Sequence, residues 1–458
     1  MAYEMKIGDE KNIFENIEEL SEYVSDILNC VGYSNNIINL RREFWREMDN
    51  KRRKESERDN RITTGSKGEG LSAPYESDTD RLYIYNYAIC RLAEDIENNT
   101  KHLAEIVMEQ GICHAGYFKL KLKTVLIDER PRHRFRKSIV DINGVSYISS
   151  NHYTRELISD AKSILSGPAA TEGDEYLSWD YVNALRCTSQ QSILLEWTSR
   201  DRPHGWPSQS VIQMIIDQEA QMVPVGFIGS GERDMEWRVS FVQGEQTLTD
   251  SLNEFQYQIY ILLKHIKTVM LAPICDEMSS FVMKNVTFWY IENNSTDTFS
   301  KQNLLTNVCA CLTLLKEAIL QKRLPYYFIK ERNLLQHRIK DPEKQQSLIR
   351  KLDELKKHPL QIFDCPKLQS ALRFTRRKLA EKGRWRDDLE EMFMNSDNIW
   401  RKDIPYRKEK EATRELMKDA SLHSVNDEIR DMVWPNWREY EGKDIYEQLA
   451  RRVKTELS

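Results

Sequence analysis

The chain has 458 residues, of which 40% are hydrophobic and 30% are charged, and its formal net charge is -5. This length accommodates two or three packed units, and the charge excludes a protein that binds nucleic acid through bulk positive charge. The eight cysteines are scattered without Cys-x-x-Cys spacing, so we expect reduced thiols and no structural zinc site. No apolar run approaches the ~20 residues needed to cross a bilayer, so we expect a cytoplasmic chain with no membrane partner.

The first half of the chain mixes helical and strand-like patterns. Apolar residues at helical spacing predict two helices within residues 11–60, interrupted near Gly32 and Ser34. We expect the second helix, from about Asn36, to form an exposed spine. Alternating patterns predict strands at 80–85, 115–127, 178–185 and 236–241, and helical spacing predicts further helices at 89–110, 153–165 and 208–219.

The rest of the chain completes an α+β pattern. Asn143-Gly144 lies between two alternating runs in residues 138–149, which predicts a hairpin with a two-residue turn. Beyond Glu245 the spacing is helical almost throughout, with helices predicted at 245–271, 301–322 and 343–357. The expected fold is therefore a mixed first half and an α-helical second half.

The segment most informative about function is Gly65-Ser66-Lys67-Gly68-Glu69-Gly70, followed by Ser77-Asp78-Thr79-Asp80. A Gly-Ser turn offers backbone N–H groups and a hydroxyl to a triphosphate. Asp78 and Asp80 are two apart on a predicted strand, so both carboxylates should point to one face, where a divalent cation would offset their repulsion. Oxygen ligands suit Mg²⁺ or Mn²⁺, and Asp180 is the candidate third ligand of a two-metal site.

Each part of this constellation also has a simpler explanation. Gly-Ser pairs occur in any loop, and a lone Asp-x-Asp is more often a turn or a solvated edge than a metal site. Asp180 by itself could be an N-cap or a salt-bridged strand end. The combination in this order is more specific, and it predicts Asp78, Asp80 and Asp180 as catalytic metal ligands.

In this order the residues resemble the cyclic GMP–AMP synthase-like receptors, the catalytic members of the Mab-domain nucleotidyltransferase superfamily. The resemblance runs from about residue 35 to 365 and includes Arg200–Pro207, Val223–Gly226, Glu236–Phe241, Ser279–Lys284 and Pro325–Leu335. It implies a bilobal, polymerase-β-like enzyme. The implied parts are N-terminal helices with the spine at 1–60, a nucleotidyltransferase core at 61–243, a helical lobe at 244–365 and a helical extension at 366–458.

The resemblance also implies an activity and partners. Double-stranded nucleic acid would bind along the spine and order the Gly-Ser loop, and ATP, GTP or related triphosphates would then be joined and cyclised. A STING-type receptor would read the product in antiviral signalling. The sequence lacks the His-Cys-Cys-Cys insertion between residues 245 and 280 that forms a zinc thumb, which favours double-stranded RNA over DNA as the activator.

Nucleotide-binding residues follow from the same resemblance, position by position. Arg238 would contact phosphates or the base, or would instead pair with Glu236 or Glu245. Phe281 would stack on a purine, unless it is a core residue. The full implied set is Gly65, Ser66, Arg238, Ser240, Lys264, Ser280, Phe281 and Lys284, in which Lys264 could equally be a solvated helix charge.

Several basic clusters could bind a duplex backbone. Three of them lie at 41–42, 51–54 and 373–378, and the first and last of these are interleaved with acidic residues, as on any solvated helix. Acidic residues are fewer around the favoured face, which consists of Lys119, Lys121, Lys123, Arg134, Arg136 and Lys137.

Two other functions remain open. The first is a non-catalytic Mab-domain scaffold or binding protein, against which the Gly-Ser pair and the three aspartates argue. The second is a terminal nucleotidyltransferase that adds nucleotides to RNA ends, against which the lack of an appended RNA-binding domain argues.

Overall fold

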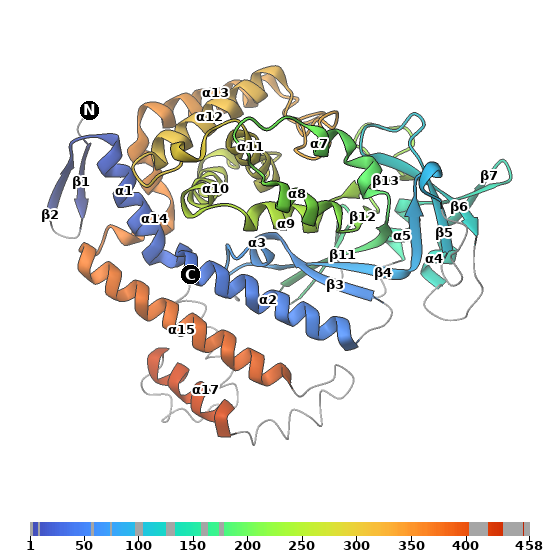
Figure 1. The fold of residues 1–458 in the computed structure, drawn as a ribbon. Coiled ribbons are helices and arrows are strands. Elements are labelled where there is room, and N and C mark those ends of the chain that lie inside the picture. The colour runs from blue at the N-terminus through green and yellow to red at the C-terminus, as the bar shows by residue number, and fades with distance from the viewer. Residues whose placement is uncertain are drawn as a thin grey trace. The chain divides into compact units, whose positions relative to one another are not determined.

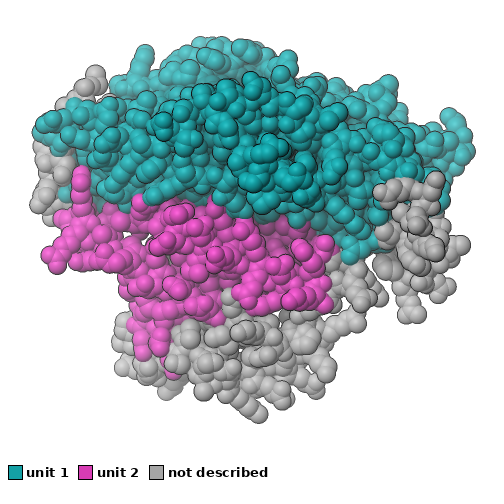
Figure 2. All heavy atoms as spheres, in the orientation of Figure 1, with its two compact units in different colours: residues 1–26, 83–170, 182–373 teal, residues 27–82, 171–181, 374–458 magenta. Residues whose placement is uncertain are grey.

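The computed structural model describes residues 3–7, 10–55, 59–73, 76–96, 104–124, 133–156, 164–173, 178–402, 420–433 and 452. The chain divides into two compact units (Figure 2). Unit 1 comprises residues 1–26, 83–170 and 182–373, and unit 2 comprises residues 27–82, 171–181 and 374–458. Both units are made of segments that are not consecutive in the chain, so they do not correspond to the four consecutive parts expected from the sequence. That division into four parts stays a prediction.

Unit 1 begins with a small hairpin. Strand β1 (Tyr3–Ile7) pairs antiparallel with β2 (Glu10–Phe14). The helix predicted from residue 11 begins only at α1 (Ile17–Leu28), so the prediction was wrong for residues 11–14. Ile13 continues the helical spacing of α1 in the sequence, but in the strand its side chain is 57% exposed and Phe14 is the buried residue.

A large sheet contains most of the strands. Its described strands run in the order β3-β4-β5-β6-β13-β12-β11-β10-β9, and β4 also pairs with β11 (Figure 1). β8 pairs with both β6 and β7, and β5 is parallel to β4 but antiparallel to β6. The bounds are β3 (Asp59–Thr64), β4 (Thr79–Arg91), β5 (Ala104–Glu109), β6 (Tyr117–Thr124), β7 (Ile139–Ile142), β8 (Val145–Ile148), β9 (Ile164–Ser166), β10 (Ala169–Gly173), β11 (Ser178–Cys187), β12 (Ala220–Val223) and β13 (Glu236–Ser240).

The strand predictions at 80–85, 115–127, 178–185 and 236–241 are confirmed by β4, β6, β11 and β13. The helix predicted at 89–110 was wrong, because β4 continues to Arg91 and β5 covers Ala104–Glu109. Ile106, Val107 and Met108 of β5 are consecutive apolar residues, so the sequence does not alternate in the way that identifies a half-exposed strand.

The hairpin of β7 and β8 confirms the predicted turn. Asn143 and Gly144 have φ values of 54° and 77°, as a type I′ turn requires. Helix α5 (Ser150–Arg155) is shorter than the helix predicted at 153–165, whose last residues belong to β9. The other short helices of unit 1 are α4 (His133–Lys137), α6 (Gln190–Ile193), α7 (Leu195–Ser199) and α8 (Gln209–Ile216), the last of which was predicted.

Longer helices follow β13, as predicted. The predicted helix 245–271 is divided at Asn253, which begins α10 with a capping box to Gln256. Helices α10 to α13 pack against one another (Figure 1). The bounds are α9 (Val242–Asp250), α10 (Glu254–Ile266), α11 (Ser280–Glu292), α12 (Leu304–Gln321), α13 (Pro342–Lys357) and α14 (Pro366–Ala371).

One described helix, α12, is long and apolar enough to cross a membrane by length and composition. Half of it is buried inside the protein, and Lys316 within it pairs with Asp353 of α13 at 2.6 Å. These contacts are those of a core helix in a globular unit.

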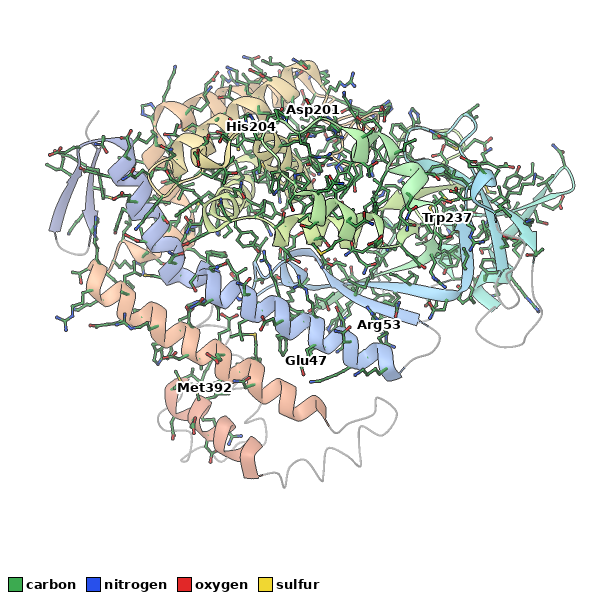
Figure 3. All side chains as sticks on the ribbon, viewed as in Figure 1. Glu47, Arg53, Asp201, His204, Trp237 and Met392 are labelled. Atoms are coloured by element: carbon green, nitrogen blue, oxygen red, sulfur yellow. The ribbon has the colours of Figure 1, made fainter. Side chains whose placement is uncertain are left out.

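Unit 2 contains the predicted spine, α2 (Asn35–Glu55). A kink at Val31 and Gly32 separates α1 from α2, and Gly32 has φ of 91°, which confirms the predicted interruption. Helix α15 (Arg376–Lys402) lies beside α2, and α17 (Ala420–Val433) packs against α15 (Figure 1). Glu47 and Arg53 lie along α2 and Met392 lies on α15 (Figure 3).

Candidate functional site

The Gly-Ser turn touches the acidic strand within unit 2. β3 leads directly into the short helix α3 (Gly65–Gly68). Gly65 has φ of 62°, and a Cβ atom there would lie only 1.9 Å from Oδ2 of Asp80. Because only glycine lets the backbone approach so closely in this conformation, the Gly-Ser pair is adapted to the carboxylate beside it.

Two buried polar side chains position this turn. Asp49 of α2 accepts hydrogen bonds from the Thr63 backbone N–H at 2.6 Å and from its hydroxyl at 2.9 Å. Burial raises the pKa of Asp49, and these two hydrogen bonds oppose that rise. Lys67 is 1% exposed and donates from Nζ to Oγ1 of Thr79 at 2.7 Å. Sequence reasoning missed Lys67, because a lysine in a glycine-rich turn is ordinarily solvent-exposed.

Asp80 and Asp180 point to the same face of the sheet. Side chains alternate between the two faces along a strand. The Arg81 guanidinium lies 6.0 Å from the ring centroid of Trp179, so these odd-numbered residues of the paired strands β4 and β11 share a face. Asp80 and Asp180, each adjacent to one of them, therefore share the opposite face.

The other contacts of these strands refine the prediction. The same alternation holds further along, where the Tyr85 hydroxyl donates to Oδ1 of Asn183 at 2.7 Å. Asp78 is exposed and precedes β4 by one residue, so it is not on the strand as predicted. Asp180 is half-buried, and its Oδ1 accepts a hydrogen bond from the Thr171 hydroxyl of β10 at 2.6 Å.

The donor chemistry fits a magnesium ion, but three ligands are not gathered. In the part of the chain that the structure describes, no group of three or more His, Cys, Asp or Glu side chains is placed to hold a metal ion. Asp80 and Asp180 nevertheless provide carboxylate oxygens on one sheet face, beside a turn that carries backbone N–H groups. Hard oxygen donors of this kind are those that Mg²⁺ prefers.

Arg238 and Ser240 lie in unit 1, on β13. Both are half-buried on one face of the strand, whereas Trp237 and Val239 on the other face are fully buried. Trp237 donates its indole N–H to the Ile148 carbonyl at 2.8 Å and lies among the strands (Figure 3). The buried face thus fixes the strand and leaves Arg238 and Ser240 on the more accessible side.

The acidic residues that were the alternative partners of Arg238 are engaged elsewhere. Glu236 accepts a hydrogen bond from the Phe227 backbone N–H at 2.8 Å, and Glu245 pairs with Lys284 at 3.2 Å. Arg238 forms no ion pair with either. Lys284 is 8% exposed, so the predicted contact of this residue with phosphates would require it to leave a buried carboxylate.

The remaining predicted nucleotide-binding residues are all half-buried in unit 1. Lys264 of α10 lies 5.7 Å from the ring centroid of Tyr260. Ser280 is the first residue of α11. Phe281 is tilted against Tyr326, with ring centroids 5.7 Å apart, which agrees with the core alternative.

The favoured basic face is neutralised by neighbouring strands and loops. Each of its described lysines has a carboxylate partner: Lys119 with Glu232 at 3.1 Å, Lys121 with Glu109 at 3.4 Å, Lys123 with Glu105 at 3.1 Å and Lys137 with Glu156 at 2.9 Å. Arg136 is exposed, and the side chain of Arg134 lies outside the described part. Acidic residues are therefore scarce near these lysines in the sequence but not in space.

Arg41 and Arg42 do not form a free basic face on the spine. Arg41 is 1% exposed, and its Nη2 donates to Oε2 of Glu390 at 2.7 Å. Arg42 is 6% exposed, and its Nε donates to the Glu69 carbonyl at 3.2 Å. Both arginines stabilise unit 2, which overturns their inclusion among the candidate nucleic-acid contacts.

Together, fold and site define an α+β protein with a Gly-Ser turn against an acidic strand and a packed set of helices in the second half. Residues 256–354, from α10 to α13, match the Mab-21 protein HhH/H2TH-like domain. The Mab-21 family belongs to the nucleotidyltransferase superfamily, so the match supports the resemblance at that level. The matched segment contains Lys264, Ser280, Phe281 and Lys284, and lies outside the Gly-Ser turn and the three aspartates.

Proposed function

We propose that this chain is a nucleotidyltransferase that joins ATP, GTP or related triphosphates into a cyclic dinucleotide. The contact between the Gly65 turn and Asp80, on the sheet face that Asp180 shares, is the observation that carries the proposal. The Mab-21 match in the helices supports it independently, because it comes from a separate part of the chain.

In this proposal each group has a defined task. Asp78, Asp80 and Asp180 would hold Mg²⁺ or Mn²⁺, and Gly65 and Ser66 would bind the triphosphate through backbone N–H groups and the hydroxyl. The metal, when bound, would lower the pKa of the attacking ribose hydroxyl and neutralise the leaving pyrophosphate. Arg238, Ser240, Lys264, Ser280 and Phe281 would position the nucleotides.

We further propose double-stranded RNA as the activator, a STING-type receptor as the reader of the product, and a cytoplasmic location. Exposed ion pairs contribute only about 0–1 kcal/mol each, so duplex phosphates could replace the partner of Lys121, whose pair with Glu109 is exposed on both sides. Binding of this kind would weaken steeply with salt, because it depends on phosphate contacts.

A non-catalytic Mab-domain scaffold is the second candidate. It is favoured by two observations: the described residues gather no three-ligand metal group, and Lys284 is held by Glu245. Such a protein would bind partners without turning over nucleotides.

An activity assay separates these functions. The protein is incubated with labelled ATP and GTP, Mg²⁺ or Mn²⁺, and duplex RNA or DNA. We expect a small phosphatase-resistant product, lost at least about 100-fold in Asp80→Asn and Asp180→Asn, because even outer partners of metal ligands contribute 10–100-fold. The control Asp201→Asn changes an exposed aspartate (Figure 3) and should retain activity.

Other outcomes have distinct meanings. Extension of the added strand would identify a terminal nucleotidyltransferase. Absence of product with every activator, in a protein whose circular dichroism shows it to be folded, would support the scaffold. Full activity of both aspartate variants would exclude the metal role.

A further inference from the structure

Three arginines converge around one tyrosine in unit 1. Arg238 of β13 lies directly opposite Tyr117 of β6 in the sheet register. The Arg332 guanidinium lies 5.7 Å from the Tyr117 ring centroid and 4.8 Å from that of Tyr326. Arg338 donates from Nη1 to the Glu277 carbonyl at 2.8 Å, and repulsion from Arg238 adds to burial in lowering the pKa of Arg338. All three arginines are half-buried.

These guanidinium groups lack carboxylate partners. No described residue forms an ion pair with Arg238, Arg332 or Arg338, and Glu245, the acid whose charge reaches Arg332, is engaged by Lys284. Burial, together with repulsion from Arg238, lowers the pKa of both Arg332 and Arg338, and the charge of Glu277 partly opposes this fall at Arg338. The protein thus holds three like charges together without compensating them fully.

The backbone that carries Arg338 is strained on both sides. His337 and Ile339 have φ values of 61° and 51°, in the left-handed region that a β-branched residue such as isoleucine rarely adopts. The Ile339 N–H donates to the Glu277 carboxylate, and Arg338 Nη1 donates to the Glu277 carbonyl at 2.8 Å. Strain that the surrounding contacts maintain is typical of side chains positioned for a ligand.

We propose that Arg238, Arg332 and Arg338 form a binding site for the phosphate groups of a small ligand, namely the phosphate tail of a nucleotide. A planar guanidinium donates parallel hydrogen bonds to phosphate oxygens, and a polyphosphate would relieve the repulsion among the three charges. Half-buried arginines beside aromatic rings suit a compact ligand, whereas a duplex backbone needs exposed cations. This inference rests on the proposed function in one respect: that function identifies the phosphate-bearing ligand as a nucleotide.

Binding of inorganic tripolyphosphate in buffer with EDTA tests the site without catalysis. We expect the Tm of the wild-type protein to rise with tripolyphosphate concentration, because a ligand of the folded state stabilises it. Calorimetric affinity should fall at least tenfold in Arg238→Gln and in Arg332→Gln. The matched control Arg350→Gln, at an exposed position of α13, should bind as the wild type does.

Further experiments distinguish failure of this inference from failure of the proposed function. Asp80→Asn should lose product formation yet bind tripolyphosphate normally. ATP without metal should compete with tripolyphosphate, whereas competition by duplex RNA and not by ATP would overturn the assignment to a nucleotide. The site itself is refuted if the wild-type Tm does not respond, or if folded Arg238→Gln binds unchanged. Arg332→Lys, which keeps the charge but not the planar fork, replaces Arg332→Gln should that variant not fold.

Discussion

At Gly65 two constraints act on one residue: a left-handed φ of 62°, and the Asp80 carboxylate 1.9 Å from the position of a Cβ atom. We expect Gly65→Ala to lower the free energy of unfolding by about 1–2 kcal/mol, because a residue with a Cβ atom is disfavoured in this conformation. The added methyl group would also displace Asp80. Urea denaturation measures the first effect, and product formation measures the second.

Gly231→Ala is the matched control. Gly231 does not have a positive φ, and a Cβ there would meet no atom within 4 Å. Its stability should change by less than about 0.5 kcal/mol. Equal stability of the two variants would show that the close approach to Asp80 is absent in solution.

Individual residues differ in how far the sequence predicted them. The turn at Gly65 and the positions of Asp80 and Asp180 on strands were predicted, because turn chemistry and strand alternation are local properties. Lys284 was assigned to phosphates, yet Glu245 engages it from another helix. A side chain's partner depends on the packing of distant segments, which no local pattern contains.

Among the elements, α15 is held to α2 by a buried ionic network. Glu390 of α15 is 0% exposed and accepts from Arg41 at 2.7 Å, and Arg386 lies 3.4 Å from the same carboxylate. The absence of a side chain at Gly32 leaves space for the Arg386 guanidinium, since a Cβ atom at Gly32 would lie 1.8 Å from Nη1 of Arg386. Helix α15 is therefore an integral part of unit 2.

Glu390→Gln tests this attachment. Removing one partner of a buried ion pair leaves uncompensated charge, and we expect a loss of about 3–5 kcal/mol in unfolding free energy. Hydrogen exchange should localise the loss to α2 and α15. The neighbouring Glu391→Gln, at an exposed position of the same helix, should be nearly neutral, and similar losses in both variants would contradict the network.

Strands were predicted best where apolar and polar residues alternate in the sequence. β6 and β13 were recognised because apolar and polar residues alternate in their sequences, whereas β5 was taken for a helix because its apolar residues Ile106, Val107 and Met108 are consecutive. β2 was missed because its pairing with β1, not its own residues, makes it a strand. An alternating sequence identifies a strand, whereas a short run of consecutive apolar residues fits a helix as well as a strand.

For the molecule as a whole, buried thiols and phenols predict loss of stability in alkali. Burial raises the pKa of Cys187, Cys365 and Tyr290 to about 12, and raises that of Tyr326 and Tyr327 well above its ordinary value. The fold therefore favours the neutral forms. Their contribution to the free energy of unfolding is complete below the pKa values of the unfolded chain, about 9 for cysteine and about 10 for tyrosine. It is lost as the pH rises toward about 12.

We expect the urea midpoint to fall progressively between about pH 9 and pH 12. The part of the tyrosinate absorbance that comes from buried residues such as Tyr326 and Tyr327 should appear with unfolding and not before it. Ionisation of every tyrosine in a fully folded protein would contradict the burial that the structure shows.

The sequence by itself determined the α+β class, the spine helix, the Asn143-Gly144 hairpin, the helical second half, and the Gly-Ser turn with its aspartates. These features depend on residues close together in the chain, where helix and strand periods and turn preferences act. Only the tertiary structure decided that Glu390 neutralises Arg41, that acidic neighbours pair with the Lys119–Lys123 face, and that Arg238, Arg332 and Arg338 lie together. Electrostatic interactions depend on distance in space, and folding sets that distance independently of separation along the chain.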